Sequence, residues 1–327
     1  MASSFLDREH VGPDLVSRTH PERVLFPQDG ISKGDLMDYY LAVSVAMLPH
    51  MRDRPLHMQR FPRGIGEEGF VQKEAPDFYP DWITRVTVEK EGGRLTQVIC
   101  DNAATLLYLA NQACITPHVW LSRKDRLHAP DRMIFDLDPA EDDFEIVRAT
   151  ARTLRSLLDQ IGLPAFVMTT GSRGLHVSVP LQRNADFDMM RAFAQEIAAE
   201  LARRDPERLT TEQRKEARRG RLFLDVGRNA YAQTAVAPYA VRARPGAPVA
   251  TPLDWSELED PQLHARCFTL RSFPRRLDER GDPWREIAQQ ATSLAAPQRR
   301  LEALQSGEGA SALHVRKVRD GEPGRSE

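Results

Sequence analysis

Three features that would assign this chain to a specialised class are missing from its sequence. Cysteine occurs only as Cys100, Cys114 and Cys267, too few and too scattered for a disulfide framework or a zinc site. No apolar run approaches the roughly 20 residues that a membrane-spanning helix needs. The N-terminal residues contain no apolar signal core either. We therefore expect a cytoplasmic protein without a membrane partner.

A strong charge of one sign is also missing. The formal net charge of the 327-residue chain is −2, so no global basic field attracts nucleic acid. Basic residues nevertheless gather in residues 18–63 and 214–221. Runs of this kind are most often solvated helix faces, and they gain significance only beside a site of another kind. The chain is 41% hydrophobic, which is enough for one large domain or two ordinary ones.

Helical and strand-like patterns alternate over the first 130 residues. Apolar residues recur with helical spacing from Ser32, the expected N-cap, to about His50. A second helix is expected to begin after Asp101 or Asn102. Strand-like runs occupy residues 56–61, 69–72, 83–88 and 95–99.

The pattern after residue 130 is more regular. A strand ends at Asp138, and the next helix has Asp142 as its expected N-cap, Glu145 at capping-box spacing and Gly162 at its end. Further elements are expected at residues 165–169 (strand), 175–180 (strand), 187–203 (helix), 222–226 (strand) and 254–258 (helix). The order strand, helix, hairpin, helix, strand predicts an α+β fold with an RRM-like core and helices on one face of the sheet.

These patterns divide the chain into four parts. We expect an N-terminal arm at residues 1–20, an α/β module at 21–130, a core at 131–290, and a C-terminal helix with a disordered tail at 291–327. The tail is rich in glycine, serine and charge, which favours disorder. No linker separates the module from the core, so we expect the two to pack together.

Two aspartates, Asp136 and Asp138, follow a short buried strand. Side chains alternate along a strand, so both carboxylates share one face while Leu137 points into the core. Adjacent carboxylates repel, and a divalent cation such as magnesium or manganese relieves that repulsion. The alternative is a pair of solvated turn acids, since aspartate before proline is common in loops.

A third acid, Asp225, lies late in another strand-like run. If it reaches the same end of the sheet as Asp136 and Asp138, three carboxylates can hold the two cations used for in-line phosphoryl transfer. The alternative is a strand-end acid paired with Arg228.

A glycine-rich turn completes the candidate site. In residues 169–176, Gly171 and Gly174 let backbone amides approach a ligand, and the hydroxyl, guanidinium and imidazole groups of the turn suit phosphate oxygens. Most such turns only reverse the chain, and an isolated histidine such as His176 is more often a satisfied core residue. The convergence of acids, glycines and bases on one sheet edge favours a site.

Several ordered motifs make the sequence resemble a known family. They are Phe-Asp-Leu-Asp-Pro at 135–139, Thr-Gly-Ser-Arg-Gly-Leu-His-Val at 170–177, Phe-Leu-Asp-Val at 223–226, Ala-Pro-Tyr-Ala-Val-Arg-Ala-Arg at 237–244, and N-terminal motifs at 21–27, 32–35, 47–50, 52–55, 109–115, 118 and 120–123. Together they resemble the polymerase domain of bacterial ligase D, of the archaeo-eukaryotic primase superfamily. The resemblance covers roughly residues 15–285 and implies a primase-type catalytic core packed against the N-terminal module. Without a ligase or nuclease segment, the chain is expected to be a stand-alone polymerase.

The resemblance implies roles for individual residues. The two divalent cations, Mn²⁺ or Mg²⁺, would be held by Asp136, Asp138 and Asp225. The incoming nucleotide would be bound by His118, Thr170, Arg173, His176 and Arg242, with support from Arg218 and secondary contacts from Ser172. Arg23 and Lys33 would grip the 5′-phosphate of a DNA gap or break, because two cations recognise a terminal phosphate that an unbroken strand lacks.

The sequence departs from the family pattern at two positions. Gln59 stands where a lysine is common, and Arg60 could supply part of the missing charge near the nucleotide or template. Val71 follows Phe70 where an aromatic pair is common, so one stacking surface is lost. Stacking contributes about 1–3 kcal/mol per base, which changes affinity without removing activity.

The expected function is that of a template-directed DNA/RNA polymerase that fills gaps and extends broken ends in bacterial non-homologous end joining. The resemblance implies that it accepts ribo- and deoxynucleoside triphosphates and works with a Ku-type end-binding protein and a DNA ligase. One alternative is a non-catalytic module that bridges 5′-phosphorylated DNA ends. Another is a glycosyltransferase that uses the Asp-x-Asp pair for a sugar nucleotide.

Overall fold

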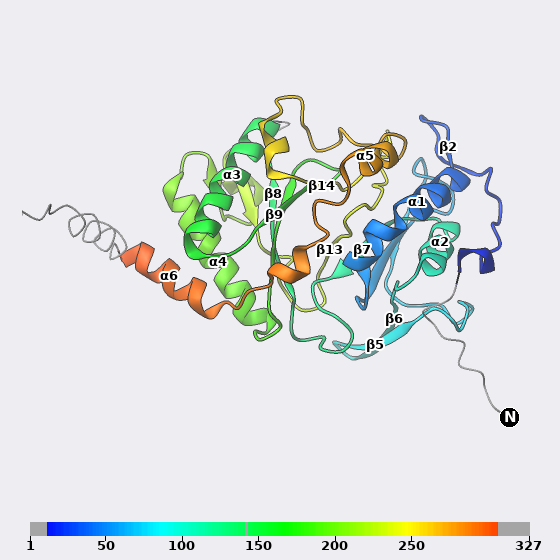
Figure 1. Cartoon of the computed structure of the whole chain (residues 1–327), viewed down its shortest axis with the longest axis horizontal. Helices are drawn as coiled ribbons and strands as arrows, with labels where there is room; N and C mark the ends of the chain where they lie inside the picture. The colour runs from blue at the N-terminus through cyan, green and yellow to red at the C-terminus, as the bar shows by residue number, and fades with distance from the viewer. Residues whose placement is uncertain (1–11, 141–142, 307–327) are drawn as a thin grey trace, which may run out of the picture.

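The two larger β-sheets face each other, and helices cover the outer face of each. The computed structural model describes residues 12–140 and 143–306. Figure 1 shows α3 (Phe144–Ile161) and α4 (Phe187–Arg204) on one side, α1 (Lys33–Met51) and α2 (Ala103–Asn111) on the other, and the strands between them. Residues 1–11 of the expected arm, the expected tail at 307–327 and Asp142 lie outside the described residues.

The larger sheet is the predicted RRM-like core. Its six strands run in the order β11 (Leu209–Thr210), β12 (Leu222–Asp225), β8 (Arg132–Asp138), β10 (Leu175–Pro180), β9 (Phe166–Thr169) and β14 (Pro252–Leu253). The central four are antiparallel, and β11 pairs in parallel with β12. The mixed α+β fold expected from the order of elements is therefore confirmed.

Alternation along β8 decides which face the helices cover. Met133, Phe135 and Leu137 are fully buried in a core shared with α3 and α4. The residues that alternate with them, including Asp136 and Asp138, therefore point to the opposite face. The predicted separation of acids from core follows from this period of two.

Helix α3 begins one residue later than the capping-box spacing predicts. Its N-cap is Asp143, whose carboxylate accepts hydrogen bonds from the amides of Glu145 and Ile146. Assigning this role to Asp142 was wrong, because the first helical residue is Phe144. The helix ends as expected at Gly162, which adopts a left-handed φ of 79°.

The smaller sheet carries the N-terminal elements. Its strands run in the order β13 (Thr234–Val236), β7 (Cys114–Trp120), β3 (Leu56–Arg60) and β4 (Phe70–Gln72). Ser32 caps α1 through a capping box with Asp35, and Asn102 caps α2. The other early strands are β1 (Val24–Phe26), β2 (Ile31–Ser32), β5 (Arg85–Lys90) and β6 (Gly93–Val98).

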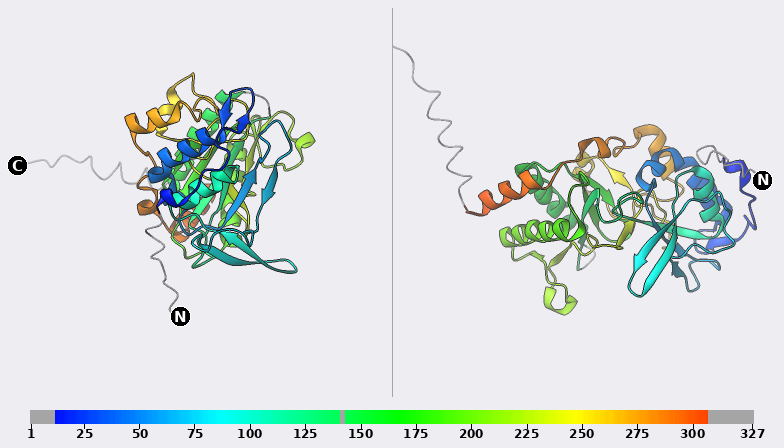
Figure 2. Two further views of the ribbon diagram at one scale, coloured as in Figure 1. Left: turned by 90° about the vertical axis from the view of Figure 1, so that its right-hand side faces the viewer. Right: turned by 90° about the horizontal axis from the view of Figure 1, so that it is seen from below.

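Shorter elements complete the described chain. They are the 3-10 helices η2 (Pro13–Leu15), η3 (Lys215–Arg218), η4 (Trp255–Glu259) and η5 (Ile287–Gln290), and the helices α5 (Phe273–Arg280) and α6 (Ala295–Ser306). The helix expected near residues 254–258 is thus a 3-10 turn. In Figure 2 the β5–β6 hairpin, in cyan, and the yellow-green segment containing η3 project from the body.

The two hydrophobic cores do not follow the order of the chain. Buried residues from the 236–250 and 270–287 segments, such as Val241 and Trp284, belong to the core of the smaller sheet together with α1 and α2. The division of the chain near residue 130 therefore stays a proposal. No helix in residues 12–140 or 143–306 combines the length and apolar character that crossing a bilayer requires.

Candidate active site

Three polar side chains form a row across the inner face of the larger sheet. Asp136 on β8 is paired directly with Asp225 on β12 and with His176 on β10. Residues opposite each other in antiparallel strands point to the same face, so all three side chains leave the sheet on the side without helices. His176 Nε2 lies 3.5 Å from Asp136 Oδ2. The sequence places these residues far apart, and strand pairing brings them together.

The two aspartates of β8 differ in their electrostatics. Burial opposes ionisation of Asp136, but the charge and hydrogen bond of His176 and the charges of Arg228 and Arg242 lower its pKa overall. The pKa of Asp138 is raised by burial and by the negative charge of Asp136, with a further contribution from Asp225. Asp138 therefore carries repulsion that a bound cation would relieve.

His118, on β7 of the smaller sheet, faces the acids across a cavity of about 140 Å³. The cavity is lined by His118, Asp136, Asp138, Thr170, Ser172, His176, Arg228, Thr234, Ala235, Val236 and Arg242. Burial, with the nearby charges of Arg242 and Arg228, lowers the pKa of His118 to about 3. His118 is therefore a neutral hydrogen-bonding group at physiological pH.

The hydroxyl of Thr170 organises the glycine-rich turn. It accepts hydrogen bonds from the amides of Ser172 (3.2 Å) and Gly174 (3.3 Å) and donates to the carbonyl of Gly174 (3.1 Å). Thr170 lines the cavity as predicted. Its hydroxyl, however, is already engaged in shaping the turn.

Both glycines of the turn are required by their surroundings. Gly171 has a φ of 62°, and a Cβ atom there would lie 2.6 Å from Arg242 Cγ. A Cβ atom on Gly174 would lie 1.9 Å from the carbonyl oxygen of Leu137, in β8. The turn therefore packs directly against the strand that carries the two aspartates.

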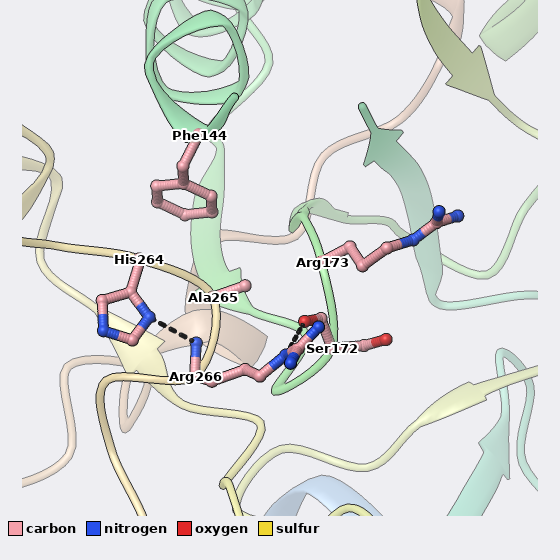
Figure 3. Close-up of a pocket in the computed structure, with 6 residues that line it drawn as sticks. All are labelled: Phe144, Ser172, Arg173, His264, Ala265 and Arg266. Carbon is pink, nitrogen blue, oxygen red and sulfur yellow. Dashed lines mark hydrogen bonds between the residues drawn. The ribbon is translucent and has the colours of Figure 1, made fainter. Parts of the chain in front are cut away.

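Guanidinium groups surround the turn. Arg173 lies 3.5 Å from Asp138 Oδ2, and Arg242 donates to the carbonyl of Thr170 at 3.3 Å. Arg266 donates to the carbonyl of Ser172 at 2.6 Å, on the side of the turn that faces a hollow of about 260 Å³. Figure 3 shows Arg266 lying along the turn and Arg173 extending away from that hollow.

Asp225 lies at the predicted strand position, but its side chain forms a hydrogen bond within the turn that follows β12. Its Oδ1 accepts a hydrogen bond of 2.7 Å from the amide of Gly227, and it does not line the cavity beside Asp136. None of the ion pairs found within residues 12–140 and 143–306 joins Asp225 to Arg228, the alternative partner. As the side chains lie, no group of three or more His, Cys, Asp or Glu residues in these ranges could hold a metal ion. The three-acid metal site therefore stays a prediction.

Arg218 lies outside the cavity. Its guanidinium donates to the carbonyls of Glu212 (3.0 Å) and Gln213 (2.8 Å) and stacks 3.9 Å from the ring centre of Phe223. Phe223 is the strand partner of Asp138. Arg218 is thus separated from the acids by one aromatic ring, and its supporting role stays a prediction.

Arg23 and Lys33 lie close together at the start of α1. Lys33 is buried, and its Nζ donates to the carbonyl of Asn111 and the hydroxyl of Thr19, each at 3.2 Å. Burial and the charge of Arg23 lower the pKa of Lys33. Arg23 is exposed and donates to the carbonyl of Pro62. Neither cation has a carboxylate ion-pair partner in the described ranges, which suits a site for an anion.

Arg60 and Phe70 face away from the cavity. Strand pairing puts them opposite each other on the face of the smaller sheet that α2 covers, and Arg60 donates to the carbonyl of Gln112 at 2.8 Å. The face toward the cavity carries Gln59 and Val71, which are also paired. Arg60 therefore does not supply the charge missing at Gln59 on the cavity side.

Two polar residues that line the cavity, Arg228 and Thr234, were not predicted from the sequence as site residues. Thr234 lies on β13, where its hydroxyl is 3.4 Å from Nδ1 of His57, the strand partner of His118. Arg228 follows Asp225 by three residues, and this closeness in the sequence could have indicated that Arg228 belongs to the site. It was read only as a possible ion pair with Asp225.

The fold and the site together define a domain of the primase type. An RRM-like sheet carries the acids beside a glycine-rich turn, and this sheet faces a second one. The family model described as "LigD, primase-polymerase domain" matches residues 32–284. The polymerase domain of Mycobacterium tuberculosis ligase D, solved in complex with DNA, superimposes with a TM-score of 0.80 and 32% identity, covering 84% of this chain and 99% of that chain. The chain belongs to the family of LigD primase-polymerase domains.

Curated relatives are longer than this chain. The multifunctional non-homologous end joining protein LigD of Pseudomonas aeruginosa is 36% identical over 286 residues, which is 86% of this chain and 34% of that protein. LigD of Mycolicibacterium smegmatis is 34% identical, over 82% of this chain and 35% of that protein. The bifunctional LigD of Bacillus subtilis is 31% identical, over 81% of this chain and 43% of that protein. The chain thus spans roughly a third of the length of the first two relatives.

Proposed function

We propose that this protein is a template-directed nucleotidyltransferase that extends and fills DNA ends during bacterial non-homologous end joining. The observation that carries the proposal is the row Asp225, Asp136, His176 on an open sheet face, beside a turn built around Gly171 and Gly174. Membership of a family whose named members act in end joining supports it.

The chemistry of the donor set fits hard divalent cations, since Asp136, Asp138 and Asp225 all offer carboxylate oxygen. When bound, two Mg²⁺ or Mn²⁺ ions would activate the primer 3′-hydroxyl and neutralise the phosphates. Asp225 would contribute by giving up the hydrogen bond that it accepts from the Gly227 amide.

The remaining residues would bind and orient the nucleoside triphosphate. Arg173, Arg242 and the amides of the turn would neutralise and position its phosphates. His118, being neutral, would contribute hydrogen bonds without adding charge, and His176 would hold Asp136 in place. Ribo- and deoxynucleotides would both be accepted. Partners would be DNA with gaps or breaks, a Ku-type end-binding protein and a DNA ligase, in the cytoplasm.

A gap-filling assay tests the proposal. The protein is incubated with Mn²⁺ or Mg²⁺, each nucleoside triphosphate and a primed duplex with a short gap and a downstream 5′-phosphate. We expect one templated addition per gap position, with ribo- and deoxynucleotides compared in parallel. Binding to the gapped duplex without any addition would instead support the non-catalytic end-bridging alternative. Release of sugar from a sugar nucleotide, independent of DNA, would support the glycosyltransferase.

The 5′-phosphate site makes a separate prediction. Lys33→Ala and Arg23→Ala should each reduce the preference for 5′-phosphorylated over unphosphorylated gaps by roughly tenfold, because hydrogen bonds to charged groups contribute about 1.5–3 kcal/mol. Extension on an open template without a downstream strand should persist. Competition binding with the two DNA substrates measures the preference.

Lys90→Ala, which removes an exposed lysine at the end of β5, is the matched control and should keep the preference. Because Lys33 is buried, its variant also needs a melting measurement, whereas Arg23 is exposed and its variant should fold normally. An unchanged phosphate preference in both variants would remove these residues from the proposed role.

A further inference from the structure

Arg228 lines the cavity, and neither the motifs nor the resemblance gives it a role. It leaves β12 three residues after Asp225, in a turn closed by the hydrogen bond from the Gly227 amide to Asp225. Its guanidinium has no hydrogen-bond or ion-pair partner in residues 12–140 and 143–306. A cation without a partner at a cavity wall is available to an anionic ligand.

The next residue fixes where Arg228 stands. Asn229 is fully buried, and its side chain accepts from the amide of Ile134 (2.8 Å) and donates to the carbonyls of Ile134 (2.7 Å) and Val226 (3.1 Å). Ile134 precedes Asp136 by two residues in β8. A buried side-chain amide with its donors and acceptors satisfied resists displacement. The backbone next to Arg228 is therefore tied to β8, the strand that carries Asp136.

Arg228 stands beside the centre of the site. It lines the same cavity as Asp136 of the larger sheet and His118 of the smaller sheet. Burial, the charge of Arg242 and then the charge of Arg228 lower the pKa of His118. The guanidinium therefore adds positive charge to the cavity that holds Asp136 and His118.

The other cations gather on the opposite side of Asp136. Arg173 belongs to the glycine-rich turn, Arg242 donates to it, and Arg266 donates to its outer side. Arg228 comes instead from the β12 side. Phosphates held by the turn cations would leave one phosphate beside Asp136, within reach of Arg228.

We propose that Arg228 is a catalytic residue that contacts the α-phosphate of the incoming nucleotide, the phosphate attacked by the primer hydroxyl. This assignment rests on the proposed function. A fixed cation beside the reacting phosphate stabilises the charge that develops there without reorganising during the reaction. Arg228 and Arg242 would thereby flank the nucleotide from two different segments of the chain.

Nucleotide binding without DNA tests the contact directly. Fluorescent guanosine mono-, di- and triphosphate share only the α-phosphate and the nucleoside, so Arg228→Gln should weaken all three by the same factor, roughly tenfold. With primed DNA, the same variant should lower kcat by about 10²-fold, as removal of a preorganised charge-stabilising donor does. Arg228→Lys should recover part of both losses.

Arg299→Gln, which removes an exposed arginine of α6, is the control for charge loss and should behave as wild type. Unchanged binding of all three nucleotides by Arg228→Gln would overturn the proposal. A loss confined to the triphosphate would also overturn it, because the contact would then be to the outer phosphates. If a melting scan shows that Arg228→Gln does not fold, Arg228→Lys decides: an equal partial loss for the three nucleotides supports the contact, and none refutes it.

The same experiment separates the Arg228 contact from the proposed function. If the wild-type protein binds the nucleotides but extends no primer, the proposed function is wrong. The Arg228 contact is then still decided by the binding measurements on the three nucleotides. Wild-type protein that binds none of the three nucleotides would overturn both.

Discussion

Replacing Asp136 by Asn should reduce primer extension by at least about 10³-fold. The substitution keeps the size of the side chain but removes the central charge of the row formed with Asp225 and His176. Metal ions supply several kcal/mol of transition-state stabilisation, and each 1.36 kcal/mol is a factor of ten in rate. Single-nucleotide incorporation on a gapped duplex, followed under single-turnover conditions, measures the loss.

Binding of 5′-phosphorylated DNA should survive the same substitution, because Arg23 and Lys33 lie at the start of α1, away from β8. The matched control is Asp125→Asn, which removes an acid that pairs with Arg183 outside the cavity. It should keep wild-type extension. Robust extension by Asp136→Asn would defeat the assignment of Asp136 as a metal ligand.

The second large effect is expected at Gly174. Gly174→Ala places a methyl group 1.9 Å from the Leu137 carbonyl oxygen, so the turn or β8 has to move. Overpacking of this kind costs about 1–3 kcal/mol of stability. Misplacement of catalytic groups by about 1 Å can cost 10²-fold in rate. We therefore expect a lower melting temperature and about a 10²-fold loss of extension.

Gly66→Ala is the control for this prediction. The nearest atom to a new Cβ there is Pro27 Cγ at 3.7 Å, which is ordinary van der Waals contact. This variant should keep both its melting temperature and its activity. Wild-type extension by Gly174→Ala would show that the packing of the turn against β8 does not position the site.

The sequence predicted the elements that depend on local patterns. The period of two along residues 133–138 correctly separated Asp136 and Asp138 from the core. Ser32 and Gly162 correctly marked a helix start and a helix end, because capping depends on neighbouring residues. Asp142 failed as an N-cap although Glu145 stands at capping-box spacing from it, because the next residue, Asp143, takes that role by accepting from the amides of Glu145 and Ile146.

Features that depend on strand pairing and on side-chain direction could not be predicted from the sequence. The order of acids and histidine across β12, β8 and β10 depends on the register of strands distant in the chain. Arg60 was considered as a possible contact of the nucleotide or template, which stays a prediction, and its position in β3 turns its side chain toward the end of α2. Arg228 was considered only as a partner of Asp225, because the hydrogen bonds of Asn229 to Ile134, which fix the neighbouring backbone, cannot be seen in a linear motif.

The return of residues 236–250 into the core of α1 and α2 has a consequence for fragments of this protein. A piece ending near residue 130 would lack β13 and expose the edge of β7, and it would lose the buried Tyr239 and Val241. A piece starting there would keep those apolar residues with nothing to cover them. We therefore expect each half to be insoluble alone, so that splitting the gene at this point would require joint expression of both pieces.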